Sequence, residues 1–142
     1  MAILIVDEAV LTRDCLVQYL QVSAPDFVVK AVGRSVDADA EYNPAAVVVN
    51  AKTYGFQDQV LSDESASVQA LWPSVPRLMI SEQPAPPSAA FEAIRRGWHG
   101  YFPADQGMEL LIAAIRLIAL GGMFIPAAAV THCVSRLQND GP

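Results

Sequence analysis

The chain has 142 residues, a formal net charge of −6, 53% apolar side chains and 17% charged ones, so it can fill the core of one domain. The acid excess excludes a surface that follows nucleic-acid phosphates, and no apolar run reaches the roughly 18 residues of a membrane span. Two distant cysteines, Cys15 and Cys133, make neither a disulfide framework nor a zinc site, and without a signal peptide we expect a cytoplasmic protein.

Five short apolar runs are typical of strands, and helical patterns lie between them. The runs fall at 3–6, 27–32, 46–49, 78–80 and 100–102. The helical patterns fall at 11–22, 57–71, 88–96 and 107–120, with room for a short helix at 35–41. Nearly continuous apolar strands are typical of a parallel sheet that is covered on both faces. The alternation predicts an α/β domain with a doubly wound, five-stranded parallel sheet.

The clearest break in the chain is the pair Gly121-Gly122. After it, Pro126 favours the start of a last helix over residues 127–137. We therefore predict a domain at residues 1–121 and a C-terminal linker segment, helical in part, at residues 122–142.

Polar side chains follow the predicted strands where the strands end. Asp7 and Glu8 follow the first strand, Asn50 the third and Ser81 the fourth. Functional groups of an open parallel sheet gather beyond the carboxyl ends of its strands. We therefore expect these side chains to form one site. Two adjacent acids with a third oxygen ligand are the donor set of a hard cation such as Mg²⁺.

These residues, in this order, resemble a bacterial response-regulator receiver domain of the NarL/LuxR-type branch, over residues 1 to about 126. The resemblance lies in ILIVDEAVLTRDCLVQYL at 3–20, PAAVVVN at 44–50, GYFP at 100–103 and LGGMFIP at 120–126. It implies the flavodoxin-like (βα)₅ fold. It places Ser81 and Tyr101 at the family's hydroxyl and aromatic switch positions. It also implies that residues 122–142 lead toward a DNA-binding domain that lies outside this sequence.

Two departures from the family pattern concern the phosphoryl group. The phosphoacceptor aspartate is Asn50 here, and the lysine three residues past the switch aromatic is Ala104. A neutral carboxamide is a poor nucleophile, and alanine cannot pair with a phosphoryl group. The resemblance therefore implies an atypical receiver in which formation of an acyl phosphate fails.

The same departure weakens the expected metal site. With Asn50, the site has two carboxylates, Asp7 and Glu8, and one neutral oxygen. Mg²⁺ gives up its water reluctantly and favours charged ligands, so we expect low affinity and no other cofactor. Lys52 lies two residues past Asn50 and is expected to reach the Asp7–Glu8 pair and neutralise it with a salt bridge.

The helix predicted at 107–120 is apolar nearly all the way round. Between Met108 and Leu120 its charged residues are Glu109 and Arg116, which lie seven residues apart on one stripe. A sheet covers one side of such a helix, so a second subunit, the segment 123–137, or both must cover the rest. We expect a homodimer, with interface candidates Leu111, Ile115, Leu117 and Ile118.

The resulting hypothesis is a phosphorylation-independent receiver, a regulatory and dimerisation module of a two-component-type transcription regulator. Two alternatives remain open: a small-molecule or nucleotide sensor that uses the degenerate acidic pocket, with Pro84, Pro86 and Pro87 beside Ser81, and a stand-alone protein–protein adaptor. Enzymatic activity is not expected. Asp7-Glu8-Ala9 follows the first strand where a flavin-phosphate loop needs N–H donors and small residues.

Overall fold

The computed structural model describes residues 1–139, and its elements follow the predicted alternation. Residues 140–142, the end of the predicted linker, lie outside the described residues. Within residues 1–139, no helix is long and apolar enough to cross a membrane. The elements in chain order are β1 (Ala2–Val6), α1 (Val10–Ser23), β2 (Val28–Val32), the 3₁₀ helix η1 (Ser35–Asp37), β3 (Ala46–Asn50), α2 (Gln59–Leu71), β4 (Arg77–Ser81), α3 (Ala89–Arg95), β5 (Gly100–Pro103), α4 (Met108–Ala119) and α5 (Ala127–Asn139).

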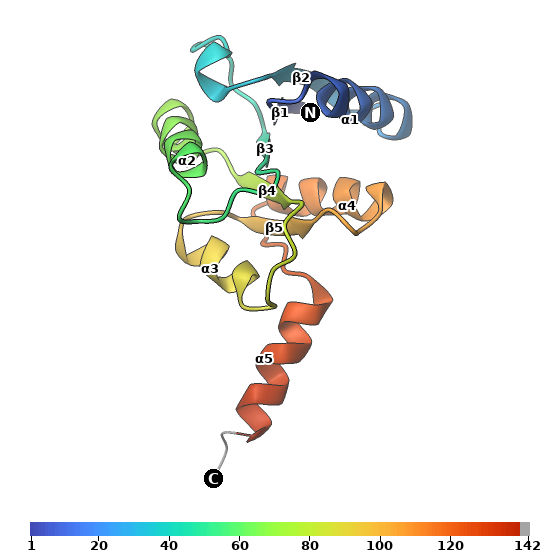
Figure 1. The fold of residues 1–142 in the computed structure, drawn as a ribbon. Coiled ribbons are helices and arrows are strands. Elements are labelled where there is room, and N and C mark those ends of the chain that lie inside the picture. Colours follow the sequence, from blue (N-terminus) through green and yellow to red (C-terminus); the bar gives the residue numbers. More distant parts are fainter. Residues whose placement is uncertain (140–142) are drawn as a thin grey trace.

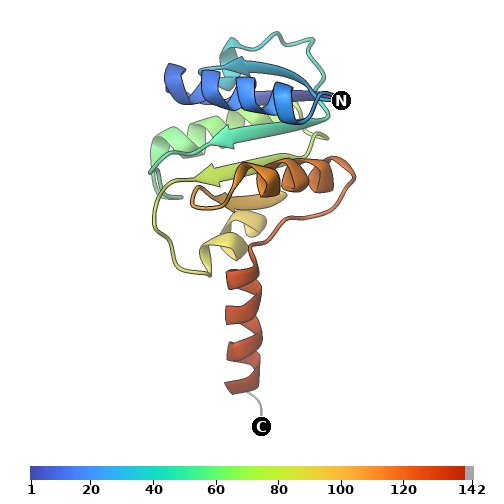
Figure 2. The same cartoon turned by 90° about the vertical axis from the view of Figure 1, so that its right-hand side faces the viewer.

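The five strands form one parallel sheet with the order β2-β1-β3-β4-β5, which confirms the predicted fold class. Helices α1 and α4 cover one face of the sheet, and α2 and α3 cover the other (Figures 1 and 2). Reversal of the strand order between β1 and β3 places the carboxyl ends of β1, β3 and β4 side by side. This is the place where open α/β sheets hold their functional groups.

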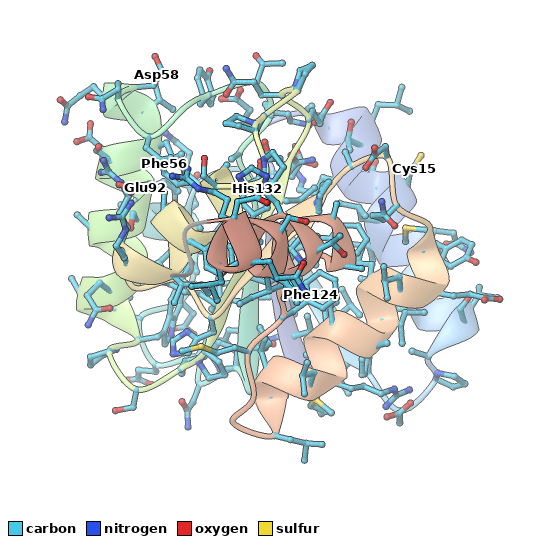
Figure 3. The ribbon with its side chains drawn as sticks, turned by 90° about the horizontal axis from the view of Figure 1, so that it is seen from below. Cys15, Phe56, Asp58, Glu92, Phe124 and His132 are labelled. Atoms are coloured by element: carbon cyan, nitrogen blue, oxygen red, sulfur yellow. The ribbon has the colours of Figure 1, made fainter. Side chains whose placement is uncertain are left out.

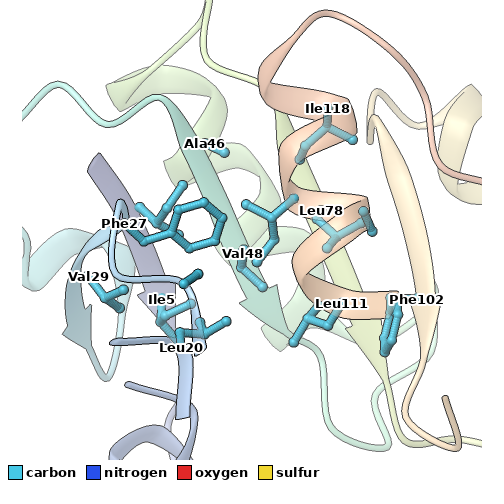
Figure 4. Packing of buried hydrophobic residues seen from close by; sticks show 14 of the residues in the cluster. Ile5, Leu20, Phe27, Val29, Ala46, Val48, Leu78, Phe102, Leu111 and Ile118 are labelled. Carbon is cyan, nitrogen blue, oxygen red and sulfur yellow. The ribbon is translucent and has the colours of Figure 1, made fainter. Parts of the chain in front are cut away.

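Alternation along the central strands supplies both halves of the core. On β1, Ile3 and Ile5 point toward α1 and α4, whereas Leu4 and Val6 point toward α2 and α3. Strand β1 is apolar on both faces because both faces are covered. Figure 4 shows Phe27 and Leu20 packed against the strands, with Ile118 reaching down from α4.

The expected helix at 35–41 is only partly present, because η1 ends at Asp37. Ser35 turns toward α2 instead of continuing a helix: its N–H donates to Glu64 Oε1 at 2.7 Å, and its hydroxyl pairs with the Ser67 hydroxyl at 2.6 Å. Side-chain bonds of this kind compete with helix propagation.

Helix α4 has a buried face and an exposed apolar face. Leu111, Ile115 and Ile118 are 0–2% exposed and belong to the core beneath the helix. They cannot contact a partner, which corrects their assignment as dimer-interface residues. On the outer side, Leu110 is 39% exposed, Leu117 41% and Leu120 87%.

The segment after α4 does not fold back over that outer face. Gly121, at φ +93°, ends the helix: its N–H and that of Gly122 donate to the carbonyls of Ile118 and Leu117. The chain then pairs with the edge of β5 through a bridge between Gly100 and Phe124. From there α5 projects away from the sheet (Figures 1 and 2).

Glycine at position 100 permits this close approach, because a Cβ there would lie 2.4 Å from Leu78 Cδ1 and 3.1 Å from Phe124 Cβ. Phe124 in turn packs against Phe102, with ring centroids 5.8 Å apart. The segment therefore covers the edge of β5 and leaves the outer face of α4 open.

A surface ion pair ties the far end of α4 to the start of β2. The Arg116 guanidinium holds both oxygens of Asp26, at 2.6 and 2.9 Å, and lies over the Phe27 ring. The hydrogen bond from Arg116 lowers the pKa of Asp26 to about 2. A lowered carboxyl pKa stabilises the fold above the unfolded value of 3.8, and that contribution is lost as the pH falls toward 2.

Truncation of a leucine to alanine should cost much stability on the buried face of α4 and little on its exposed face. Leu111→Ala removes a fully buried side chain and should lower the free energy of unfolding by about 2–5 kcal/mol. Leu117→Ala is a matched change on the exposed face and should shift it by about 0.5 kcal/mol or less. Urea unfolding of both variants tests this, and an equal loss in the two would contradict the assigned orientation of α4.

Candidate functional site

The strand ends bring the predicted polar residues to one edge of the sheet. Asp7 follows β1, Asn50 ends β3 and Ser81 ends β4, and these three strands are neighbours. All three side chains are buried, with Asp7 at 0%, Ser81 at 5% and Asn50 at 9% exposure. The three residues therefore lie at the same edge of the sheet, and the partners of each side chain define what that edge can do.

The Asp7 carboxylate is surrounded by donors from its own chain. Lys52 Nζ lies 2.7 Å from Asp7 Oδ1, and the Ala9 N–H donates to the same oxygen at 2.9 Å. The Asn50 amide donates to Asp7 Oδ2 at 3.1 Å. A buried carboxylate needs a counter-charge and hydrogen bonds. Here an ammonium group and two N–H groups provide them.

Asn50 bridges the buried acid and the loop that carries the lysine. Its Nδ2 donates to Asp7, while its Oδ1 accepts the Lys52 N–H at 2.9 Å. Exchanging the two amide atoms would set donor against donor at Lys52 and acceptor against acceptor at Asp7, so the partners fix the orientation of the amide. The carboxamide therefore satisfies both neighbours, which a carboxylate at this position could not do.

The loop after β3 aims Lys52 at Asp7. Lys52 has φ +53°, the left-handed region that few residues other than glycine adopt. Its N–H is held by Asn50 Oδ1, and its carbonyl accepts the Glu82 N–H at 2.8 Å. A backbone strain of about 1–3 kcal/mol persists where surrounding contacts fix the residue, as these two hydrogen bonds do.

Glu8 does not share the lysine. Its Oε1 accepts a hydrogen bond from the Tyr54 hydroxyl at 3.1 Å, and this bond raises the pKa of Tyr54. The second carboxylate near Lys52 is Glu82, with Oε2 3.6 Å from Nζ. The predicted salt bridge thus forms with Asp7 but not with Glu8. Sequence reasoning missed Glu82, because a residue just past β4 is brought to the loop after β3 only by strand pairing.

The residues do not fit a bound Mg²⁺ ion. Both oxygens of Asp7 are occupied by donors, the Lys52 ammonium stands beside the acid, and Asn50 turns its NH₂ group toward the same carboxylate. Within residues 1–139, no cluster of three or more His, Cys, Asp or Glu side chains has the geometry to hold a metal ion. Mg²⁺ needs oxygen ligands in near-octahedral geometry, and this donor set does not offer them.

Ser81 and Tyr101 lie on neighbouring strands and face the same side of the sheet. Met79 pairs with Tyr101 and Ser81 with Pro103, so the side chains at 81 and 101 are diagonal neighbours. Ser81 Oγ accepts the Gln83 N–H at 3.3 Å, and Tyr101 is 6% exposed. Ala104, exposed just past β5, has no side-chain group to offer and donates its N–H to the Ser81 carbonyl at 2.8 Å.

The histidines and cysteines form no second reactive centre in the described part of the chain. His99 Nδ1 accepts the Arg77 N–H at 3.2 Å, and burial together with the nearby Arg77 charge lowers the His99 pKa. Figure 3 shows Cys15 on the outer side of α1 and His132 on α5. His99 therefore links the chain before β5 to the start of β4 by hydrogen bonds with Arg77. Among the described residues, no acid, base and nucleophile lie together around it.

Comparison with known proteins places the fold. No protein-family model matches the chain, and no curated protein matches it. A two-component response regulator of the LuxR family from Aurantimonas sp. SI85-9A1 matches with a TM-score of 0.76 at 19% identity, over 96% of this chain and 97% of that one. A LuxR family DNA-binding response regulator from Silicibacter pomeroyi matches with a TM-score of 0.72 at 21% identity, over 90% and 98%.

The isolated REC domain of RcsB from Salmonella enterica serovar Typhimurium matches with a TM-score of 0.71 at 13% identity, over 92% of this chain and 96% of that one. Its structure was determined in the presence of the phosphomimetic BeF₃⁻. These similarities show that the chain has the fold of a response-regulator receiver domain.

The burial of Asp7 predicts a strong dependence on its ammonium partner. Lys52→Met keeps the aliphatic stem and the backbone strain but leaves the Asp7 charge unpaired, which should cost about 3–5 kcal/mol of unfolding free energy. Lys30→Met, on the exposed edge of β2, is the control and should cost less than 1 kcal/mol, in the range of about 0–1 kcal/mol for surface charges.

Adding Asp7→Asn to Lys52→Met removes the unpaired charge and should recover most of the loss, as measured by chemical denaturation. Equal stability of the single and double variants would show that Lys52 does not neutralise Asp7.

Proposed function

We propose that this chain is a regulatory receiver-fold module that works without phosphorylation and acts as a homodimer. The observation that carries the proposal is the closed network of Asp7, Asn50 and Lys52. An ammonium group stands beside the buried acid, and an amide replaces the nucleophile. The site is self-neutralised, so it needs neither a metal ion nor a phosphoryl group for its charge balance.

The chemistry of the individual groups supports the same reading. Phosphoryl transfer relies on a nucleophile, on a metal ion and on cations that hold the transferred group. Here Asn50 is a weak nucleophile, Lys52 is engaged with Asp7 and Glu82, and Ala104 has no charge. At this edge of the sheet, the nucleophile, the metal site and the cations are therefore all weakened or absent among the groups named here.

A second copy of the chain is the partner that we propose for the outer face of α4. The exposed residues Leu110, Ala113, Leu117 and Leu120 recur at intervals of three and four and form one line along the helix, which we call the α4 stripe. This spacing is typical of helices that pair. The stripe contains no charge, and the segment 122–126 turns away from it to β5.

The dimensions of the stripe suit a two-fold contact. Twelve helical residues span about 18 Å, and Met123, 55% exposed, extends the apolar surface beyond the helix. Two such surfaces related by a two-fold axis bury the same patch on both subunits. A stable dimer needs at least about 1,000 Å² of buried surface in total, so residues flanking the stripe must also contribute.

The proposal includes a place in a larger regulator. The matched structures include LuxR-family proteins that are described as DNA-binding response regulators. We assign residues 1–121 to the receiver-fold domain and residues 122–142 to a connecting segment toward a DNA-binding domain, acting in the cytoplasm. Helix α5 supports this assignment because it leaves the sheet beyond β5 and leads the chain away from the core (Figure 2).

The proposal predicts that phosphodonors leave the chain unmodified. Incubation with acetyl phosphate and Mg²⁺ should give no labile phosphoryl adduct in intact-mass spectra, because Asn50 is a carboxamide. Asn50→Asp alone should also fail to form a stable adduct, since the Lys52 ammonium group is paired with Asp7 and Ala104 provides no ammonium group. A labile adduct of one phosphoryl group on the wild-type chain would contradict the proposal.

Dimerisation through the α4 stripe predicts that one carboxylate will break the dimer. Leu117→Asp should leave a folded monomer, because burying an unpaired charge in an apolar interface costs several kcal/mol. Leu11→Asp, on the exposed side of α1 (78% exposed), is the matched control and should remain dimeric. Light scattering during size exclusion measures both, with circular dichroism as the folding check. A monomeric wild-type chain at about 100 µM would contradict the proposed dimer.

A further inference from the structure

A cavity of about 740 Å³ lies next to the switch positions and is separate from the Asp7 network. It is lined by the loop after β4, the loop after β5, the segment 124–126 and the first turn of α5, and it is open to solvent on one side. We call it the Tyr101 cavity. Its volume falls within the range of small-molecule sites, about 300–1,000 Å³. Figure 3 shows Phe124, one of its lining residues, between α4 and α5.

The walls of the Tyr101 cavity are mainly apolar. They comprise the prolines at 84, 86, 87, 103 and 126, together with Leu110, Phe124 and Ile125. Among residues 1–139, no lysine, arginine or histidine lines it, and the charged residues that do are Glu82 and Asp105. Such walls disfavour phosphate and carboxylate groups, so this cavity favours an uncharged ligand.

Two hydroxyl groups at the floor of the cavity have unused donors. Tyr101 and Ser81 are both more than nine-tenths buried, and both line this cavity and a smaller one of about 330 Å³ on the other side of the Pro84–Pro86 loop. Among residues 1–139, neither hydroxyl donates a hydrogen bond, although Ser81 Oγ accepts one from the Gln83 N–H. Both hydroxyls lie in residues that line the cavity, and both are free to donate to water or to a ligand inside it.

The position of Tyr101 differs from that of Tyr42. The Tyr42 hydroxyl has no partner and is fully enclosed, so nothing can reach it without local opening. Tyr101 lines both cavities and is accessible to a molecule inside them. Of these two tyrosines, Tyr101 is the one that combines an unused donor with room for a ligand.

We propose that the Tyr101 cavity binds an uncharged, mainly apolar small molecule through a carbonyl oxygen that accepts hydrogen bonds from the Tyr101 and Ser81 hydroxyls. The apolar body of the ligand contacts the proline rim and Phe124. Because the first turn of α5 forms one wall, with Ala129 buried there, a bound ligand would contact this turn and Tyr101 of β5 together. The site thus supplies an input to the module that requires no phosphoryl group.

The test uses a neutral fluorescent ketone, 6-propionyl-2-dimethylaminonaphthalene, whose emission reports both polarity and hydrogen bonding to its carbonyl. We expect saturable binding to one site with a blue-shifted emission. Tyr101→Phe removes one donor and should weaken binding about two- to tenfold, which is the range for one hydrogen bond. Tyr19→Phe on α1 is the matched control and should bind like the wild type.

A second pair of variants tests the location. Ala104→Trp places a large ring in the cavity and should weaken binding at least about tenfold, by occupying space that the ligand needs. Ala70→Trp, on the exposed end of α2, should have no effect. The anionic probe 1-anilinonaphthalene-8-sulfonate should bind more weakly than the ketone, because the cavity has acidic neighbours and no cation.

Absence of saturable ketone binding, or binding that is unchanged in Tyr101→Phe, would overturn the inference. If Ala104→Trp does not fold, the tyrosine pair still decides the result. Binding is measured on protein that has not been incubated with a phosphodonor. Leu117→Asp should bind the ketone like the wild type. Failure here is therefore distinguishable from failure of the proposed dimer or of phosphorylation independence.

Discussion

The buried contact between Lys52 and Asp7 is the constraint on which the rest of the site depends. A fully buried carboxylate at the end of β1 must be neutralised, and in this chain the neutralising charge is covalently attached to the next strand's loop. The contact fixes the loop after β3 in a conformation that side chains seldom adopt, and this conformation sets where Asn50, Glu82 and Tyr54 can find partners. A mobile ion could exchange with solvent, whereas this ammonium group is part of the fold.

The sequence predicted most of the architecture because the signals were local. Five strand-length apolar runs and the glycines after α3 and α4 locate the elements to within a few residues. The residues 35–41 were harder, because Ser35 finds its partners on α2, which is distant in the sequence. Position at a strand end was enough to bring Asp7, Asn50 and Ser81 together. It could not reveal that Lys52 would choose Asp7 over Glu8.

The orientation of helix α4 could not be predicted from its sequence. A helix that is apolar all round has no sequence signal to say which side meets the sheet, so Leu111, Ile115 and Ile118 were assigned to the wrong surface. Their burial follows from the sheet beneath, and it leaves the stripe from Leu110 to Leu120 as the exposed face of the helix within residues 1–139. The cavity at Tyr101 was equally hidden, since residues 124–129 form its wall only after the chain has turned back along β5.

The bridge between Gly100 and Phe124 also bears on aggregation. An uncovered edge strand is a template for pairing with strands of other molecules, and proteins protect such edges with loops, charges or bulges. At one edge of this sheet, the Phe124 carbonyl accepts the Tyr101 N–H, and the Phe124 N–H donates to the His99 carbonyl. At the other edge, β2 carries the charged Lys30, whose ammonium group lies 4.7 Å from the centre of the Tyr42 ring. With both edges guarded in this way, strand addition between copies is discouraged, and self-association is directed to the helices.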